Sequence, residues 1–216
     1  MEEIIKIPKV KICGITEERE AEFLNEGKAD YAGMVFYEKS RRNISFIQAE
    51  KLIRCLDAEI GKVAVAVNPT LEFAKEAAQR GFDLLQVHGN IEKKVRENSP
   101  IPIWRAVNIT DADALHAFFE EEEKAGMEGI IGYVADGMGY GGGRPFDWKG
   151  LCVNVRKQLK GKQLILAGGL TEQNVKEGIC CFLPDIVDVS SGVEEEGKKS
   201  RAKIIKFIRK VREHEQ

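Results

Sequence analysis

The most informative stretch of the chain is residues 9–16, which read Lys-Val-Lys-Ile-Cys-Gly-Ile-Thr. An alternating, β-branched run ends there on Cys13 followed by Gly14, the pattern of a buried strand that reaches a sharp turn. In a barrel of repeated strand–helix units, such a strand tip is where chemistry takes place. A free cysteine is also among the most often buried residues, so Cys13 has a second interpretation as a small core side chain.

Strand-like and helical patterns alternate along the rest of the chain. The predicted strands are Val10–Cys13, Tyr31–Phe36, Val63–Val67, Leu84–Val87, Ile101–Val107, Gly129–Val134, Gln163–Ala167 and Ile186–Val189. The predicted helices lie at about 17–27, 47–60, 70–80, 91–98, 111–125, 147–160, 172–179 and 198–213. Eight such units predict an α/β fold with one domain over residues 1–216, a closed (β/α)₈ barrel (TIM barrel). An open flavodoxin-like sheet is the alternative, although it normally uses fewer units.

Composition excludes several classes of partner. The formal net charge is −2, from 33 Lys and Arg against 35 Asp and Glu, so no overall field draws the chain to nucleic acid or membrane. No apolar run approaches the length of a membrane span, and no signal segment is expected. The five cysteines are odd in number and lack metal-ligand spacing, which favours a reduced, cytoplasmic setting without a metal site.

Two late units end in turns suited to an anion. The strand over 163–167 runs into two glycines, and the next strand runs into Ser-Ser-Gly. Backbone N–H groups in such turns approach an anion closely, and barrels often build a phosphate site after strands seven and eight. The predicted phosphate-binding residues are Gly168, Gly169, Ser191 and Gly192. Tight turns capped by Thr171 and Ser190 are the alternative.

Polar residues also follow two earlier strands. Arg41 and Arg42 come after the second strand, and the planar fork of an arginine suits two-point contact with a carboxylate or phosphate. A solvated loop arginine is the alternative. His88 follows an apolar strand, where it could serve as acid, base or ligand. Because Gln86 lies beside it, we interpret His88 as hydrogen-bonded scaffolding.

A glycine-rich segment over residues 133–148 follows the sixth strand. Its glycines, including Gly142 and Gly143, suit a loop that folds over a ligand. A flexible surface loop with no part in binding is the alternative. Asp136 is a candidate acid facing Cys13 across the mouth of the barrel. Asp147 is typical of a carboxylate at a helix N-terminus.

At these residues the chain resembles the phosphoribosylanthranilate isomerase family over essentially its whole length. The matching elements are residues 11–16, 36, 40–42, 86–89, 141–148, 167–170 and 188–194. The first and last of these are specific, whereas the central glycines are less so. The resemblance implies a (β/α)₈ barrel that carries out a cofactor-free Amadori rearrangement in tryptophan biosynthesis. The substrate is N-(5-phosphoribosyl)anthranilate, and the product is 1-(2-carboxyphenylamino)-1-deoxyribulose 5-phosphate.

The resemblance also implies roles for individual residues. The family's cysteine base falls on Cys13, and its arginine for the anthranilate carboxylate falls on Arg42. Phosphate contacts fall on the two late turns. Gln86, His88, Gly142 and Gly143 are expected to support the site.

The chain departs from the family pattern near the acid. Gly142 stands where the family usually has a hydroxyl residue, and the register of the sixth strand is ambiguous. A strand ending at Ile131 puts Gly132 in the place of the acid, and a longer strand puts Asp136 there. We assign Asp136, because the chemistry needs an acid and the following glycine permits the turn. The third strand also carries small alanines, which either widen a pocket or repack the barrel.

Two other functions remain open from the sequence. One is a related isomerase of another aminated ribose phosphate, although such barrels typically rely on two aspartates. The other is a barrel that binds a phosphorylated sugar but is altered in substrate or catalytically weak, because the acid is misplaced. A monomer and a homodimer are both compatible with the sequence.

Overall fold

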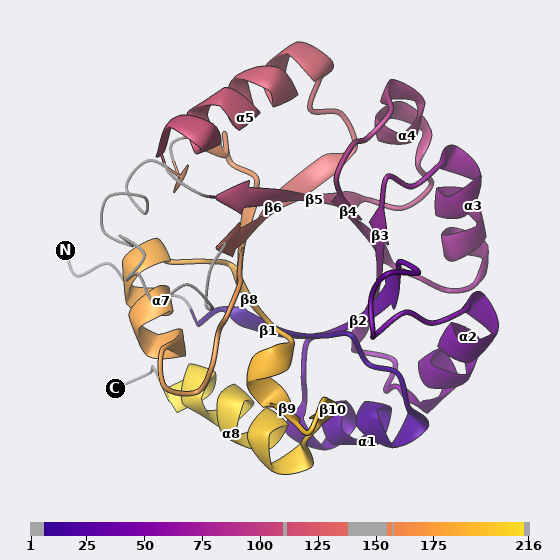
Figure 1. The fold of residues 1–216 in the computed structure, drawn as a ribbon, viewed down its shortest axis with the longest axis vertical. Helices are drawn as coiled ribbons and strands as arrows, with labels where there is room; N and C mark the ends of the chain where they lie inside the picture. Colours follow the sequence, from indigo (N-terminus) through magenta and orange to yellow (C-terminus); the bar gives the residue numbers. More distant parts are fainter. Residues whose placement is uncertain (1–6, 110–111, 138–154, 157, 214–216) are drawn as a thin grey trace.

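The computed structural model describes residues 7–109, 112–137, 155–156 and 158–213. Eight parallel strands form a closed barrel in chain order, and helices form a ring outside them (Figure 1). The barrel strands are β1 (Lys9–Cys13), β2 (Tyr31–Phe36), β3 (Gly61–Val67), β4 (Leu84–His88), β5 (Ile103–Ile109), β6 (Ile130–Gly137), β7 (Gln163–Ala167) and β8 (Ile186–Val189). The closed barrel confirms the predicted fold class over the open sheet.

The outer helices follow the strands as the periodicity predicts, with shifted ends. They are α1 (Glu18–Gly27), α2 (Phe46–Cys55), α3 (Leu71–Gln79), α4 (Lys93–Asn98), α5 (Ala112–Ala125), α7 (Val175–Phe182) and α8 (Arg201–Arg212). The helix predicted for 147–160 lies largely outside the described residues. Within the described part of the chain, no helix is both long enough and apolar enough to cross a membrane.

Local hydrogen bonds fix several of these ends. Ser45 and Gln48 form a capping box, each side chain accepting from the other's backbone N–H, so α2 begins at Phe46. The α7 helix begins later than predicted, because the side chain of Asn174 holds a turn in front of it. Its Oδ1 accepts from Thr171 N at 2.8 Å, and its Nδ2 donates to Gly169 O at 3.1 Å.

The prediction of a helix over 198–213 is wrong at its start. Residues Glu194–Glu195 (β9) and Lys198–Lys199 (β10) pair as a short antiparallel hairpin, and a single turn of 3₁₀ helix, η1 (Ser191–Val193), precedes them. Ser200 then accepts from the backbone of Lys203 and caps α8. Two-residue strands of glutamate and lysine carry no β pattern, so the hairpin could not be predicted from periodicity.

Alternation along the strands divides the core into an inner and an outer part. The inner cluster comprises Val63, Val65, Leu84, Trp104, Ala106, Val134, Ile165 and Ile186, all buried. The larger outer cluster packs the strands against the helices and includes both Ala64 and Ala66 of β3. On β1 the same alternation puts Lys9, Lys11 and Cys13 on one face, and Cys13 packs against the inner cluster.

Candidate active site

A cavity of about 430 Å³ opens at the carboxyl ends of the strands, a size that suits a small-molecule ligand. The predicted site residues that line it are Cys13, Arg42, Gln86, His88, Asp136, Gly168, Gly169 and Ser191. Gly192 follows Ser191 but does not border the cavity, and Gly142 and Gly143 lie outside the described residues. The structure therefore gathers residues from strands at both ends of the chain around one opening.

Cys13 is the last residue of β1 and is partly buried at the base of this cavity. Its Sγ lies over Gly33 of β2, where an added Cβ would come within 2.9 Å of the sulfur. Any larger residue than glycine there would displace the thiol. The backbone carbonyl of Cys13 accepts a hydrogen bond from Ser190 Oγ at 2.9 Å, which ties β1 to the turn after β8. Ser190 therefore makes no side-chain cap of its own turn, contrary to one of the sequence alternatives.

Asp136 lies near the end of β6 and faces the cavity, because this strand extends to Gly137 rather than stopping at Val134. Gly132 pairs with Gln163 at the opposite, amino-terminal end of the strands. The longer strand of the two sequence alternatives is therefore the one observed. Burial raises the pKa of the Asp136 carboxyl, and the nearby Asp188 charge raises it further.

Beneath Cys13 lies an ion pair that the sequence analysis did not single out. Lys11 is fully buried, and its Nζ donates to Asp188 Oδ2 at 2.6 Å. The two residues are register partners on β1 and β8, the pair of strands that closes the barrel. The sequence feature that could have indicated this pair is Lys11 itself, a charged residue in the middle of β1, two residues before Cys13 and on the same face of the strand.

Arg42 reaches the cavity from the loop after β2 and is held by Glu194. Its Nε donates to Glu194 Oε1 at 2.7 Å, and its Nη2 donates to Oε2 at 3.0 Å. Arg41 also pairs with this carboxylate but does not border the cavity. Burial raises the pKa of Glu194, but hydrogen bonds from Arg42 and Lys199 outweigh it and hold the pKa below its ordinary value. Glu194 is thus a charged partner that fixes the arginine fork.

The glycine after the cysteine has a packing reason. Gly14 adopts a φ of +78°, and an added Cβ there would lie 2.3 Å from Arg42 Cδ. The side chain of Arg42 therefore crosses directly over Gly14, which requires both the left-handed conformation and the missing Cβ.

The two anion turns lie against each other at the carboxyl ends of the neighbouring strands β7 and β8. Gly168 and Gly169 have φ values of +84° and +64°, so the chain turns in a conformation that favours glycine. An added Cβ on Gly192 would lie only 1.9 Å from the carbonyl oxygen of Leu170, so the second turn packs closely on the first. Gly192 thus brings the turns together, while Gly168, Gly169 and Ser191 face the cavity.

Gln86 and His88 make their hydrogen bond with each other, with the two Nε2 atoms 2.9 Å apart. Burial lowers the pKa of His88 to about 4, with smaller effects from the charges of Lys11, Asp188 and Arg105. The ring is therefore neutral at pH 7, and its Nε2 accepts from the amide of Gln86. A neutral ring that is already hydrogen-bonded fits the interpretation as scaffolding.

Among the described residues, no three His, Cys, Asp or Glu side chains are grouped so as to hold a metal ion. The groups around the cavity are instead a thiol, two carboxyls, an arginine and two turns rich in glycine and serine. This combination suits proton transfer on a ligand held by its anionic ends.

The fold and the cavity define the class: a (β/α)₈ barrel with its polar site at the carboxyl ends of the strands, as in TIM-barrel enzymes. The chain belongs to the N-(5'-phosphoribosyl)anthranilate isomerase family. The family model described as N-(5'phosphoribosyl)anthranilate (PRA) isomerase matches residues 10–210.

Individual members of the family are similar over nearly their full length. The N-(5'-phosphoribosyl)anthranilate isomerase of Thermoanaerobacter pseudethanolicus is 42% identical over 213 residues, covering 94% of this chain and 98% of the relative. The isomerase of Clostridium acetobutylicum is 41% identical over 207 residues, with the same coverage.

Solved structures of phosphoribosyl anthranilate isomerases are also similar to this chain in fold. Phosphoribosyl anthranilate isomerase from Thermotoga maritima superposes with a TM-score of 0.82 at 31% identity, over 95% of this chain and 99% of that one. A phosphoribosyl anthranilate isomerase in complex with reduced 1-(o-carboxyphenylamino)-1-deoxyribulose 5-phosphate gives a TM-score of 0.80, also at 31% identity and with the same coverage.

Proposed function

We propose that this protein converts N-(5'-phosphoribosyl)anthranilate to 1-(2-carboxyphenylamino)-1-deoxyribulose 5-phosphate, an aldose–ketose isomerisation of tryptophan biosynthesis. One observation carries the assignment to residues: Cys13 and Asp136 line the same cavity as Arg42 and the two glycine-bearing turns. The substrate has a carboxylate at one end, a phosphate at the other and a ribose between them. The cavity offers an arginine, an anion site and two proton-transfer groups to match.

The anionic ends of the substrate fix its position. Arg42 is proposed to bind the anthranilate carboxylate through its planar fork, with Glu194 holding the guanidinium in place. Backbone N–H groups of the turns at Gly168–Gly169 and Ser191–Gly192 are proposed to bind the phosphate. Binding at both ends leaves the ribose over the strand tips, between the thiol and the carboxyl.

The rearrangement needs an acid and a base at separate atoms of the sugar. Asp136 is proposed to protonate the furanose ring oxygen, so that the ring opens to a Schiff base. Cys13 as a thiolate is then proposed to remove the proton from C2', which gives an enolamine that tautomerises to the ketone. This chemistry requires only proton transfers, so the protein's own side chains suffice and no cofactor is expected.

The acidity of Asp136 suits its part in this scheme. A carboxyl can donate a proton near neutral pH only when its pKa is raised well above the ordinary value. Burial and the Asp188 charge both act in that direction here. The same cavity therefore supports the acid role of Asp136 and weighs against a barrel that merely binds a phosphorylated sugar.

The proposed scheme has consequences for the cellular setting and assembly. A thiolate base works only while it is reduced, which supports the expected cytoplasmic location. Each residue with a proposed role belongs to the same chain, so the chemistry requires no second subunit, and both a monomer and a homodimer are compatible with it.

The direct test is the decay of substrate fluorescence when purified protein is added to phosphoribosylanthranilate. We expect turnover by the wild type and its loss in Asp136→Asn, with binding of the reduced product analogue retained. Binding of the analogue without turnover by the wild type would instead favour the non-catalytic barrel.

A further inference from the structure

The buried ion pair of Lys11 and Asp188 stands out because it places two charges in the interior of the barrel. Lys11 has no exposed surface, and Asp188 is 6% exposed. A buried pair usually stabilises a fold no more than well-packed apolar side chains of the same volume, because both charges must leave water. A charge pair placed directly under the proposed base therefore points to a role in the reaction.

Lys11 lies beside the thiol of Cys13. Both side chains project from the same face of β1, and both lie over Gly33 of the next strand. An added Cβ on Gly33 would be 2.9 Å from Cys13 Sγ and 3.1 Å from Lys11 Cε. The ammonium is one bond beyond Cε, so a positive charge adjoins the sulfur. Such a charge favours the thiolate over the thiol.

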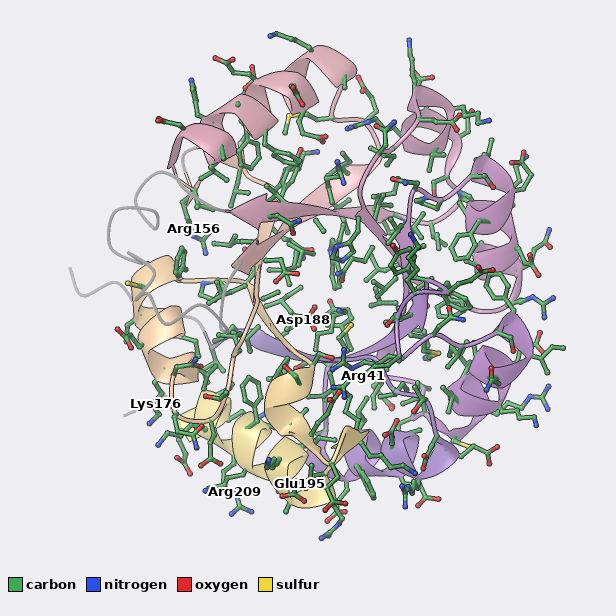
Figure 2. The ribbon with its side chains drawn as sticks, viewed as in Figure 1. Arg41, Arg156, Lys176, Asp188, Glu195 and Arg209 are labelled. Atoms are coloured by element: carbon green, nitrogen blue, oxygen red, sulfur yellow. The ribbon has the colours of Figure 1, made fainter. Side chains whose placement is uncertain are left out.

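Asp188 lies on the same cavity as the proposed acid. It borders the opening together with Asp136, and Figure 2 shows it inside the ring of strands. Its Oδ2 binds Lys11, whereas its buried Oδ1 has no hydrogen-bond partner among the described residues. A nearby negative charge that is only partly neutralised favours the protonated form of a second carboxyl.

Resting on the function proposed above, we propose that Lys11 and Asp188 are positioning residues: Lys11 favours the thiolate form of Cys13 against the cost of burial, and Asp188 favours the neutral acid form of Asp136 at the same pH. The reaction needs this combination. The carboxyl proton of Asp136 passes to the ring oxygen as the C1'–O bond breaks, and the thiolate takes the C2' proton. The C2'–H electron pair then forms the C1'–C2' double bond, while the π electrons of the C1'–N bond return to nitrogen.

The two charges of the ion pair act in opposite directions on the thiol and on the carboxyl, and one of them favours the required form in each case. Burial has the largest effect on the Cys13 thiol and holds its pKa above the ordinary value; Asp188 raises it further, whereas Lys11 and Lys199 lower it. For Asp136, burial and Asp188 raise the pKa and Lys11 lowers it. The other titratable or charged side chains bordering the cavity are Tyr37, Arg42 and the neutral His88. Lys11 is thus the adjoining cation for the base, and Asp188 the adjoining anion for the acid.

The first test measures the thiol without any substrate. The rate of alkylation of Cys13 by iodoacetamide is followed against pH, with the modified peptide identified by mass spectrometry. Lys11→Met is expected to raise the thiol pKa by about one unit or more, so alkylation at neutral pH slows about tenfold. Asp188→Asn is expected to lower the thiol pKa, because Lys11 then faces the sulfur alone.

Two further variants keep this test decisive. Lys9 lies on the same face of β1 but is exposed near the ring of Tyr31, so Lys9→Met is the matched control and should leave the thiol pKa unchanged. The double variant Lys11→Met/Asp188→Asn leaves no unpaired buried charge, and its thiol pKa is expected above that of Asp188→Asn. This comparison stands even where Lys11→Met alone does not fold.

The second test is the pH profile of kcat/KM. Lys11→Met is expected to move the acidic limb, set by Cys13, to higher pH. Asp188→Asn is expected to move the alkaline limb, set by Asp136, to lower pH. A merely structural pair would lower activity and melting temperature in both variants without opposite shifts, and that result overturns the proposal.

The two tests also separate this proposal from the proposed function. Opposite shifts in alkylation by a protein that does not turn over phosphoribosylanthranilate would support the ion-pair proposal and contradict the function. Turnover by the wild type, with no shift in the alkylation curve or in the pH profile of kcat/KM of the variants, would support the function and contradict the ion-pair proposal.

Discussion

The two ends of the barrel interior differ in how their polar groups are satisfied. At the amino-terminal end, Trp104 is fully buried, stacks edge-to-face on Tyr31 with ring centroids 5.0 Å apart, and donates to Gln163 Oε1 at 3.0 Å. At the carboxyl end, buried Asp188 Oδ1 and Gln86 Oε1 have no partner in the described part of the chain. The amino-terminal end, whose buried polar groups are hydrogen-bonded, contributes to stability. The carboxyl end, where buried polar atoms lack protein partners, is suited to bind a ligand.

The largest expected effect is at the carboxyl end. Cys13→Ser should lower kcat by at least about 10²-fold, because a positioned general base contributes roughly 10²–10⁴-fold. The melting temperature should change little, since the side chain is only partly buried. The measurement is steady-state fluorescence kinetics beside thermal unfolding.

Cys55, at the end of α2, is the matched control for this variant. Cys55→Ser should retain turnover, because this thiol lies on the outer side of the barrel with the outer core. Equal losses in the two serine variants would mean that turnover reports on general damage rather than on Cys13.

The amino-terminal end should respond in the opposite way. Trp104→Ala is expected to lower the free energy of unfolding by about 3–5 kcal/mol, because it leaves a cavity and removes the contact with Tyr31. Turnover per folded molecule should stay close to that of the wild type. Urea unfolding and active-site titration check the two statements, and an intact fold with lost turnover would erase the distinction between the two ends.

Arg42 and the neighbouring Arg41 provide a matched pair of variants at the carboxyl end of the barrel. Arg42→Met should raise KM about tenfold or more, because a hydrogen bond to a charged group contributes about 1.5–3 kcal/mol. Arg41→Met should change KM little, since its side chain is 58% exposed and does not border the cavity. Similar KM values for the two variants would remove Arg42 from carboxylate binding.

The smallest expected effect is on the pH dependence of stability. The pKa of His88 is about 4 in the folded protein against an ordinary 6.5. The unfolded chain therefore binds a proton that the folded protein does not, and stability present above pH 6.5 is lost as the pH falls toward 4. At about 1.4 kcal/mol per pKa unit, this loss is at most about 3.5 kcal/mol.

His88→Gln should flatten that part of the stability curve, measured by urea unfolding at several pH values. His116 is exposed on α5 and provides the control, so His116→Gln should leave the curve as in the wild type. A wild-type curve already flat between pH 6.5 and 4 would show that the ring takes up its proton in the folded state.

The sequence was sufficient for the barrel and for most of the cavity. Eight alternating units define the barrel, and strand ends place residues such as Cys13 and His88 at one mouth. The end of β6 was ambiguous, because the residues before Asp136 form an apolar run with no mark of where pairing stops. Only the neighbouring strands, with Asp136 opposite Asn108 and Ala167, define it.

Contacts between the two ends of the chain could not be predicted in this way. Lys11 and Asp188 are 177 positions apart, and Arg42 and Glu194 are 152 positions apart. Each pair forms only when the first strands of the chain pair with the last. Hydrophobic periodicity is a local pattern and does not predict contacts between distant strands. The alternation of β1 nevertheless put a lysine on the same face as Cys13, which is a local signal for a buried charge.

The most direct test of the account is a structure of this protein with the reduced product analogue bound. We predict the phosphate in the turns of Gly168–Gly169 and Ser191–Gly192, with C2' about 3–4 Å from Cys13 Sγ and the Asp136 carboxyl on the former ring oxygen. An analogue with its phosphate elsewhere, or with the thiol and carboxyl on parts other than the ribose, would contradict it.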